Sequence, residues 1–423
     1  MRGSKKWCRN PDGRYKTAFG RRDRIRNLAK CWIIWILTVG MMFSFPLRLS
    51  AANENLTISA PSAILIEKTT GSILYEKEAD TRRAPASVTK VMTMLLIMEG
   101  ISEGKIHKDD QVTVSEYAAS MGGSQVFLEP GETQTVDTML KCIAVASAND
   151  ACVAMAEHLC GSEKVFVEKM NEKAKELGMT NTHFVNCNGL DAEGHETTAR
   201  DISLMSRELI TKYPEIQNYS MIWMENITHH TRKGDSEFGL TNTNKLVRQY
   251  EYATGLKTGS TGNAKFCVSA TAKKDDVELI AVIMGAENSK ERFKDAITLL
   301  GYGFGVCRLY QDEKMPKLKP VKVENGKQET AELQYANPFT WLDTTGAKFG
   351  EIEKKLNLPE KIKAPGKKGE TIGTLDYYLG KEKIGSVEIC LKETIEKASL
   401  KDWIHKMLSR YCHGVIEISG YIV

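Results

Sequence analysis

The sequence predicts an α/β (α+β) domain with an antiparallel sheet and helices, followed by a small all-β domain and a C-terminal amphipathic helix. Three observations lead to this prediction. β-Patterned runs stand at both ends of residues 53–311, with helical patterns between them. Short β runs broken by glycine fill residues 312–393. Residues 394–423, the rest of the chain, contain apolar residues at helical spacing.

The first 52 residues have the pattern of a secretory signal peptide. A basic segment of 30 residues is followed by the apolar run Cys31–Leu47 and then by Ser50-Ala51-Ala52, so we expect cleavage after Ala52 and export to the outer face of the cell membrane or beyond. The alternative is an uncleaved anchor, because the apolar run approaches the length of a membrane span. Cleavage would remove about ten net positive charges from a chain of net charge +4. The mildly acidic remainder argues against nucleic acid as a partner.

In residues 53–311 the predicted elements follow one another with clear boundaries. Ala63–Glu67 and Ser72–Glu76 alternate across a Thr-Thr-Gly turn and predict a β-hairpin. Helical patterns extend from Ser87 to about Leu177, and Ser162 and Gly178 are typical cap residues of the last helix.

The second half of this segment returns to the sheet. The polar, Gly-rich stretch Asn186–Asp201 leads into a helix beginning near Ile202. Ala264–Thr271 and Val277–Met284 then predict two strands. A helix from about Glu291 to Gly301 closes the predicted domain.

Beyond Asp312 lysine and proline accumulate, and runs such as Thr371–Leu379 and Gly385–Leu391 predict a small β domain without catalytic motifs. The final helix has apolar residues at i, i+3, i+4, i+7, i+8 and i+11: Leu400, Trp403, Ile404, Met407, Leu408 and Tyr411. Its other side is basic: Lys401, His405, Lys406 and Arg410. This pattern predicts a helix on an anionic membrane surface. The alternative is a helix packed on the β domain. The tail Val415–Val423 has a strand-like pattern.

Cysteine and histidine spacing gives no reason to expect a metal or another cofactor. Eight cysteines would remain after cleavage, but their spacing forms no compact disulfide framework. Cys142, Cys152, Cys160 and Cys267 lie in apolar patterns, which predicts free thiols. The sequence has neither a Cys-x-x-Cys pair nor a His pair at helical spacing, so we predict no metal site.

Three short motifs in a fixed order carry the chemistry: Ser87-Val88-Thr89-Lys90, Ser147-Ala148-Asn149 and Lys257-Thr258-Gly259. Each alone is weak, since a second Ser-x-x-Lys occurs at Ser102–Lys105. Ser87 precedes an apolar helix, where the helix dipole favours developing negative charge. Lys90 is one turn further on, so its amine can reach the serine hydroxyl. A lysine can act as the base if burial and a neighbouring positive charge, here Lys257, lower its pKa.

The other motif residues suggest complementary roles. The Ser147 hydroxyl can relay a proton to a leaving amine, and the Asn149 amide can orient Lys90 or a substrate carbonyl. Lys257 and Thr258 can bind a substrate carboxylate, and Gly259 lets a peptide approach the strand, which we expect to begin just after this motif. The backbone N–H groups of Ser87 and Ser260 are candidates for an oxyanion hole.

With these motifs the chain resembles the penicillin-binding protein and serine β-lactamase superfamily, and most closely its low-molecular-mass D-alanyl-D-alanine carboxypeptidases. Further support comes from the stretches Gly189-Leu190-Asp191, Thr198-Ala199-Arg200-Asp201 and Ile283-Met284-Gly285-Ala286. The resemblance implies an acyl ester on Ser87, Lys90 as proton acceptor, Ser147 as second catalytic hydroxyl and Lys257 as substrate-binding residue. It implies the peptidoglycan stem peptide with a D-Ala-D-Ala terminus as substrate and β-lactams as acylating inhibitors. Ser260 stands where some relatives have histidine. Ser124 and Thr243 fall in loops that border the cleft in relatives.

Several alternatives stay open. A class A β-lactamase has Glu-x-x-Leu-Asn between the second and third motifs. Here that string occurs at Glu353–Asn357, beyond Lys257, where we expect a helical surface segment. A non-catalytic cell-wall binding or sporulation protein on the same scaffold would be expected to lose Ser87 or Lys90. A transpeptidase or endopeptidase would keep both, because the shape of the site selects the acceptor.

Overall fold

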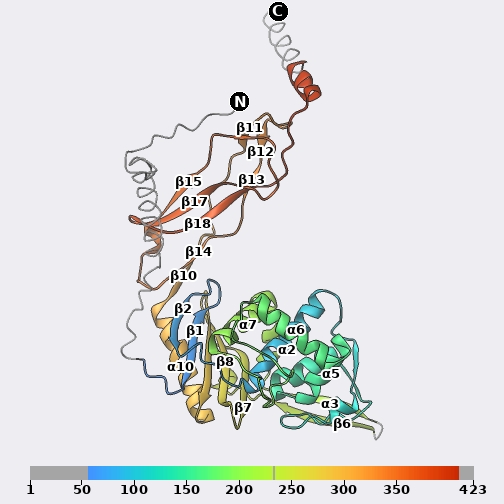
Figure 1. Ribbon diagram of the computed structural model, residues 1–423. Coiled ribbons are helices and arrows are strands. Elements are labelled where there is room, and N and C mark those ends of the chain that lie inside the picture. The colour runs from blue at the N-terminus through green and yellow to red at the C-terminus, as the bar shows by residue number, and fades with distance from the viewer. Residues whose placement is uncertain (1–55, 232–233, 409–423) are drawn as a thin grey trace, which may run out of the picture. The chain divides into compact units, whose positions relative to one another are not determined.

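The computed structural model describes residues 56–231 and 234–408, and its catalytic part is built on a five-stranded antiparallel sheet (Figure 1). The strand order is β2-β1-β9-β8-β7, so β7 is an edge strand. The strands are β1 (Ser62–Glu67), β2 (Ile73–Lys77), β7 (Ala253–Thr261), β8 (Lys265–Lys274) and β9 (Val277–Ala286). The predicted fold class and the hairpin of β1 and β2 are confirmed.

Both faces of the sheet are covered. Ile64, Ile66 and Val282 point into a core shared with helices α2 and α7, whereas Leu65 and Ala281 belong to a second core under α10. Every residue of β1 is therefore buried. The strand lacks the alternation of buried and exposed residues that is expected when one face is open to solvent.

The helical part lies between β2 and β7 in the sequence. Its longer helices are α2 (Lys90–Ser102), α4 (Val136–Lys141), α5 (Asn149–Cys160), α6 (Glu163–Glu176) and α7 (Ala199–Lys212), and α10 (Ser289–Val306) follows β9. Short helical elements are η1 (Ala86–Thr89), α3 (Glu116–Ala119), η2 (Cys142–Ala146), η3 (Pro214–Ile216), α8 (Gln217–Ser220) and α9 (Leu246–Gln249).

Cap residues explain where several helices begin. The Ser162 side chain accepts a hydrogen bond from the backbone N–H of Val165, as predicted. Helix α7 begins three residues earlier than expected, because Thr198 caps it. Helix α10 extends the predicted range at both ends, with Asn288 as its cap.

Two hairpins of the catalytic part were not predicted. They are β3 (Gln111–Thr113) with β4 (Thr133–Thr135), and β5 (Met224–Thr231) with β6 (Gly234–Thr241). Most residues of β6 are exposed, so this strand lacks the apolar face on which a prediction depends.

The C-terminal part is all-β, as predicted. Its strands are β10 (Arg308–Gln311), β11 (Val321–Glu324), β12 (Thr330–Ala331), β13 (Leu333–Tyr335), β14 (Thr340–Asp343), β15 (Ile352–Asn357), β16 (Lys361–Lys363), β17 (Thr371–Leu379) and β18 (Glu382–Leu391), with the short turn η4 (Phe349–Glu351). Phe339 stacks on Tyr377 at 3.6 Å in its core. The prediction of a helix at Glu353–Asn357 is wrong: these residues form β15, which pairs with β17.

Residues 400–408 are helical, in agreement with the start of the predicted amphipathic helix. The expected signal peptide, Tyr411 and the strand-like tail lie outside the described residues. In residues 56–231 and 234–408, no helix combines the length and the apolar character needed to cross a bilayer. The cysteines of these ranges are free thiols, as predicted.

Candidate active site

The serine of the first motif stands on a tight turn ahead of α2. Ser87 lies in the 3₁₀ turn η1, and the α-helix itself begins at Lys90 rather than at Val88. Ala86 has a left-handed φ of 49°, which is uncommon for a residue with a side chain. The Ala86 carbonyl packs against Gly189, where an added Cβ atom would lie only 2.0 Å from the Ala86 oxygen. A glycine at position 189 therefore lets the turn before Ser87 close.

Lys90 is the centre of the polar contacts. Its side chain is fully buried, and its Nζ donates to Ser87 Oγ at 3.0 Å, Asn149 Oδ1 at 2.6 Å and the Asn188 carbonyl at 2.6 Å. These bonds use the three donors of an ammonium group. Burial lowers the pKa of Lys90, against an opposing effect of Cys152, Cys187 and Asp150.

The second motif joins two helices. The π-helical turn η2 ends at Ser147, which has a left-handed backbone, and Asn149 is the first residue of α5. Asn149 Nδ2 donates to the Gly122 carbonyl at 2.7 Å, and its backbone N–H donates to the Ser124 carbonyl at 2.7 Å. Ser147 is buried, and its hydroxyl makes no hydrogen bond within the described residues. Its donor and acceptor capacity is thus unused.

The third motif lies inside edge strand β7, not just before a strand as expected. Lys257 is 1% exposed, and its Nζ donates to the Thr258 carbonyl at 3.0 Å. The Thr258 hydroxyl lies 2.8 Å from that of Thr243. A Cβ atom on Gly259 would lie 2.6 Å from the backbone nitrogen of Ser87, so the strand contacts the serine turn directly. Ser260 is exposed.

The two lysines shape the electrostatics of the site. Burial is the first cause that lowers the pKa of Lys257, and the charge of Lys90 lowers it further. For Lys90, burial lowers the pKa, whereas the sequence had suggested a contribution from the Lys257 charge. Within the described residues, neither lysine forms an ion pair with a carboxylate. The site therefore holds two desolvated amines and is suited to an anionic ligand.

Arg292 adds a third buried cation behind the third motif. Its Nη1 atom donates to the carbonyls of Gly259 and Cys267, each at 3.2 Å, and its guanidinium lies 4.5 Å from the centre of the Phe293 ring. Burial lowers the pKa of Arg292 to about 10. The arginine supports the strand that contacts Ser87.

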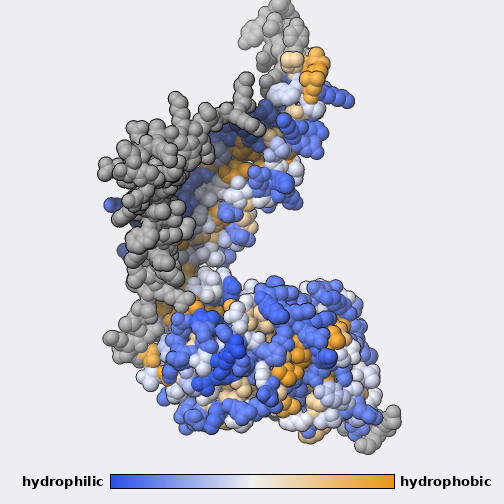
Figure 2. Space-filling view, in the orientation of Figure 1, coloured by the Kyte–Doolittle hydropathy of each residue, from blue (hydrophilic) through white to orange (hydrophobic). Residues whose placement is uncertain are grey.

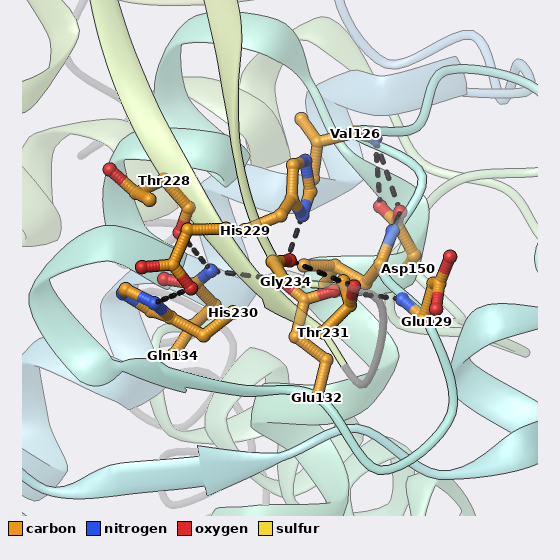
Figure 3. Close-up of polar contacts among 12 residues, drawn as sticks. Val126, Glu129, Glu132, Gln134, Asp150, Thr228, His229, His230, Thr231 and Gly234 are labelled. Carbon is orange, nitrogen blue, oxygen red and sulfur yellow. Dashed lines mark hydrogen bonds and ion pairs between the residues drawn. The ribbon is translucent and has the colours of Figure 1, made fainter.

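The loop of residues 122–132, which accepts hydrogen bonds from Asn149, is anchored at two points (Figure 3). The Asp150 carboxylate accepts from the backbone N–H of Val126 at 3.1 Å and of Leu128 at 3.2 Å. Further along, Glu132 is buried and accepts from His229 Nδ1 of β5 at 2.7 Å. The β5–β6 hairpin thus fixes one end of the loop, and α5 fixes its middle.

The structure brings side chains of the three predicted motifs together, but sequence reasoning missed part of the frame around them. The Asn188 carbonyl, which accepts from Lys90, and the Gly122 carbonyl, which accepts from Asn149, are backbone groups without a sequence signature. The Asn-Gly pair at residues 188–189 was the available signal for a special turn. Across residues 56–231 and 234–408, no group of three His, Cys, Asp or Glu side chains is placed to hold a metal ion.

Comparison with known proteins agrees with this geometry. A family model described as D-alanyl-D-alanine carboxypeptidase matches residues 49–288, more than half of the chain. The chain belongs to the D-alanyl-D-alanine carboxypeptidase family. A second model, described as the C-terminal domain of penicillin-binding protein 5, matches residues 307–397. The family resemblance predicted from the three motifs is confirmed.

Individual relatives align with most of the length of this chain. D-alanyl-D-alanine carboxypeptidase DacF of Bacillus subtilis is 44% identical over 356 residues, which are 84% of this chain and 90% of that protein. The crystal structure of penicillin-binding protein 5 from Haemophilus influenzae has a TM-score of 0.69 at 28% identity, covering 81% of this chain and 98% of that one. A DD-transpeptidase from Streptomyces has a TM-score of 0.55 at 29% identity and covers 59% and 98%. The fold is that of a penicillin-binding protein.

Proposed function

We propose that the chain is a serine D-Ala-D-Ala carboxypeptidase, which removes the terminal D-alanine of peptidoglycan stem pentapeptides through an acyl-enzyme on Ser87. The observation that carries this proposal is the contact at 3.0 Å between Nζ of the buried Lys90 and Oγ of the partly buried Ser87. A nucleophilic serine needs a base within this distance. The relatives are D-alanyl-D-alanine carboxypeptidases by name, which supports this substrate class.

In acylation, Ser87 Oγ attacks the carbonyl carbon of the penultimate D-alanine, and its proton passes to the lone pair of neutral Lys90. The N–H groups of Ser87 and Ser260 bind the developing oxyanion. When the C–N bond breaks, the leaving amine takes a proton relayed by the Ser147 hydroxyl. Water then attacks the ester carbonyl, the C–O bond breaks, and Ser87 regains its proton. Asn149 holds Lys90 in position throughout, by accepting at 2.6 Å.

The terminal carboxylate of the substrate gives Lys257 and Thr258 their role. An anion beside Lys257 would favour its charged form, and that charge would in turn favour the neutral form of Lys90. Substrate binding would therefore help to prepare the base. Gly259 keeps the strand clear of a Cβ atom beside the backbone nitrogen of Ser87. β-Lactams carry a carboxylate and a strained amide, and we expect them to acylate the same serine.

The test is a time course of intact protein mass after mixing the enzyme with benzylpenicillin. We expect a long-lived adduct that peptide mapping assigns to Ser87, and D-alanine release from a pentapeptide substrate. Ser87→Ala should lose both while keeping its thermal unfolding temperature, because a single partly buried hydroxyl is removed at the start of a helix. Full D-alanine release by Ser87→Ala would contradict the proposal.

The same time course separates the rival functions. An adduct that disappears within seconds while the drug is consumed would identify a β-lactamase, although Glu353–Asn357 lies in strand β15 of the C-terminal part. The absence of any adduct would indicate a non-catalytic protein. Adding an acceptor amine tests for transpeptidase activity, since the Streptomyces relative is named a DD-transpeptidase. A new peptide product, rather than free acid, would identify transfer.

We also propose that the C-terminal helix binds an anionic membrane surface after export of the enzyme. Apolar side chains of residues 400–408 gather in the segment that Figure 2 shows in orange, and they are 46–78% exposed: Leu400, Trp403, Ile404, Met407 and Leu408. On the other side, Lys406 donates to the Gly326 carbonyl of the β domain at 2.8 Å. Trp403 and Met407 line a groove with the β domain, but the apolar side chains as a set stay largely exposed, which fits a helix lying on lipid.

Deleting Leu400–Val423 should release the enzyme from vesicles of anionic lipid without changing its acylation by penicillin. Trp403→Lys with Met407→Lys should weaken binding in the full-length chain, and Lys355→Ala, an exposed lysine of β15, is the control. Membrane attachment that survives the deletion in cells would favour an uncleaved N-terminal anchor instead.

A further inference from the structure

His195 is a buried histidine behind the serine turn to which none of the roles above applies. It is 5% exposed, and its ring makes two hydrogen bonds. The backbone N–H of Val185 donates to Nδ1 at 2.9 Å, and Nε2 lies 2.8 Å from the Thr89 hydroxyl oxygen. Because a backbone N–H can only donate, Nδ1 is the acceptor and the proton of the neutral ring is on Nε2. The ring therefore donates to Thr89.

Thr89 passes this bond on to the serine turn. Its hydroxyl donates to the Ala86 carbonyl at 2.8 Å. The Ala86 carbonyl and the Ser87 N–H belong to the same planar peptide group, so the orientation of one fixes that of the other. A hydrogen bond accepted by the carbonyl also polarises the group and strengthens its N–H as a donor, by about 10–30% per bond in a chain.

This peptide group needs support. Ala86 has a left-handed φ of 49°, a conformation that costs energy for a residue with a Cβ atom. Gly189 packs against the same carbonyl oxygen from one side, and Thr89 binds it through a hydrogen bond. Thr89 is fully buried, so water does not replace the bond if it is lost.

We propose that His195 is a positioning residue for the oxyanion hole: its neutral Nε2–H form, acting through Thr89, holds the Ala86 peptide so that the Ser87 N–H points at the substrate carbonyl. His195 itself touches no substrate. The inference rests on the proposed function, since it assigns the Ser87 N–H to the oxyanion of an acylation reaction.

The surroundings keep the ring in the required form. Burial is the first cause that lowers the pKa of His195, to about 4, and His183 adds to the effect while Asp191 opposes it. Phe184 covers the ring, with 5.9 Å between the centres. A proton on Nδ1 would place two donors, Nδ1–H and the Val185 N–H, face to face. The neutral tautomer and the relay to Ala86 are thus retained across the neutral pH range.

Two pairs of variants test this role in the full-length enzyme. Thr89→Val removes the hydroxyl at nearly constant shape, and Thr89→Ser restores it. His195→Phe removes both ring bonds, and His195→Gln keeps a donor and an acceptor. The readouts are the second-order rate of acylation by benzylpenicillin and the infrared carbonyl stretch of the acyl ester, which moves to higher frequency when oxyanion-hole hydrogen bonds weaken.

We expect Thr89→Val to acylate about tenfold more slowly, less than the 10²–10³-fold cost of removing a whole oxyanion donor, and to raise the carbonyl frequency. Thr89→Ser should stay close to the wild type in both readouts, and His195→Gln should lie between His195→Phe and the wild type. If Thr89→Val and His195→Phe change thermal stability but leave the carbonyl stretch unmoved, the residues are structural only and the inference is wrong. A wild-type protein that forms no adduct would instead overturn the proposed function.

Discussion

The active site and the C-terminal β domain bury charged side chains in opposite ways. In the β domain, Asp312 accepts from Lys354 at 2.7 Å and from Tyr377 at 2.8 Å, and Asp343 accepts from Arg308 at 2.7 Å. Burial alone would raise the pKa of Asp312, but the bonds from Lys354 and Tyr377 outweigh it and lower the pKa. The charged form of this carboxyl is therefore the stable one in the fold.

In the active site, Lys90 and Lys257 are also buried, yet only neutral groups accept their hydrogen bonds. Burial lowers the pKa of both lysines, so folding disfavours their charged forms. The difference separates two uses of buried charge. Ions that are matched within the chain stabilise the fold, whereas under the proposed function the two unmatched lysines would gain an ionic partner only when a substrate carboxylate binds.

Replacing Lys90, the proposed base, should have the largest effect on the rate of acylation. Lys90→Met should reduce the rate of acylation by penicillin about 10²–10⁴-fold, because general base catalysis contributes that range. Stopped-flow or mass measurement of adduct formation gives the rate. Lys105→Met is the matched control: it belongs to the second Ser-x-x-Lys, is exposed and pairs with Glu103. If both variants acylate alike, Lys90 is not the base.

As the pH falls, the active-site side should lose stability before the C-terminal β domain does. The pKa of His195 falls from 6.5 in the unfolded chain to about 4 in the fold, so the unfolded state binds protons more readily between these values. Stability is therefore complete above pH 6.5 and decreases as the pH falls toward 4, by about 3 kcal/mol from this group. Lys383, and then Ser386, lower the pKa of Asp376 from 3.8 to about 2, so its contribution is present above pH 3.8 and is lost only below it.

Hydrogen exchange measured from pH 7 to pH 3 should accordingly show residues 183–198 losing protection before strands β17 and β18. His195→Gln should flatten the change above pH 4, and His107→Gln, which alters an exposed histidine, should leave it in place. Earlier loosening of β17 and β18 would contradict the assignment of this acid sensitivity to the active-site side.

The sequence was sufficient for the side chains that act over short spacings. Ser87 and Lys90 are three residues apart, which on a helix places them on one face, and their contact followed from that geometry. The sequence analysis assigned joint roles to the first and third motifs, through Lys257 and Ser260, but it did not predict the contact of Gly259 with Ser87. Strands β8 and β9 were predicted because they carry near-continuous apolar runs.

The rest depended on contacts that a local pattern does not encode. Nothing in the neighbourhood of His195 predicts that its ring binds Thr89, 106 residues earlier. The β5–β6 hairpin is largely polar, since His229 serves to bind Glu132 rather than to fill an apolar core. The π-helical turn before Ser147 has the sequence pattern of an ordinary helix, because its five residues form a wholly apolar run that does not distinguish the two.

Crowding the strand against the serine turn is expected to have the third largest effect. In Gly259→Ala the new Cβ atom would meet the Ser87 nitrogen at 2.6 Å and the Val88 nitrogen at 2.9 Å, both of them backbone atoms that cannot move aside alone. We expect acylation to fall up to about 10²-fold, as for a displacement of reacting groups by about 1 Å. Gly262→Ala, with no atom within 4 Å, should acylate normally. Equal acylation rates in the two variants would show that β7 can move away from Ser87 without loss of activity.

The smallest effect is expected from the matched ions, and it should appear in stability alone. Lys354→Met leaves the buried Asp312 carboxylate without its cation, which should lower the free energy of unfolding by about 1–3 kcal/mol. Lys355→Met, the exposed neighbour on β15, should change it by less than about 0.5 kcal/mol. Both variants should acylate at the wild-type rate, which thermal melts and adduct kinetics together will show. Slower acylation in Lys354→Met alone would break the contrast, because the charges of the β domain would then serve the reaction and not only the fold.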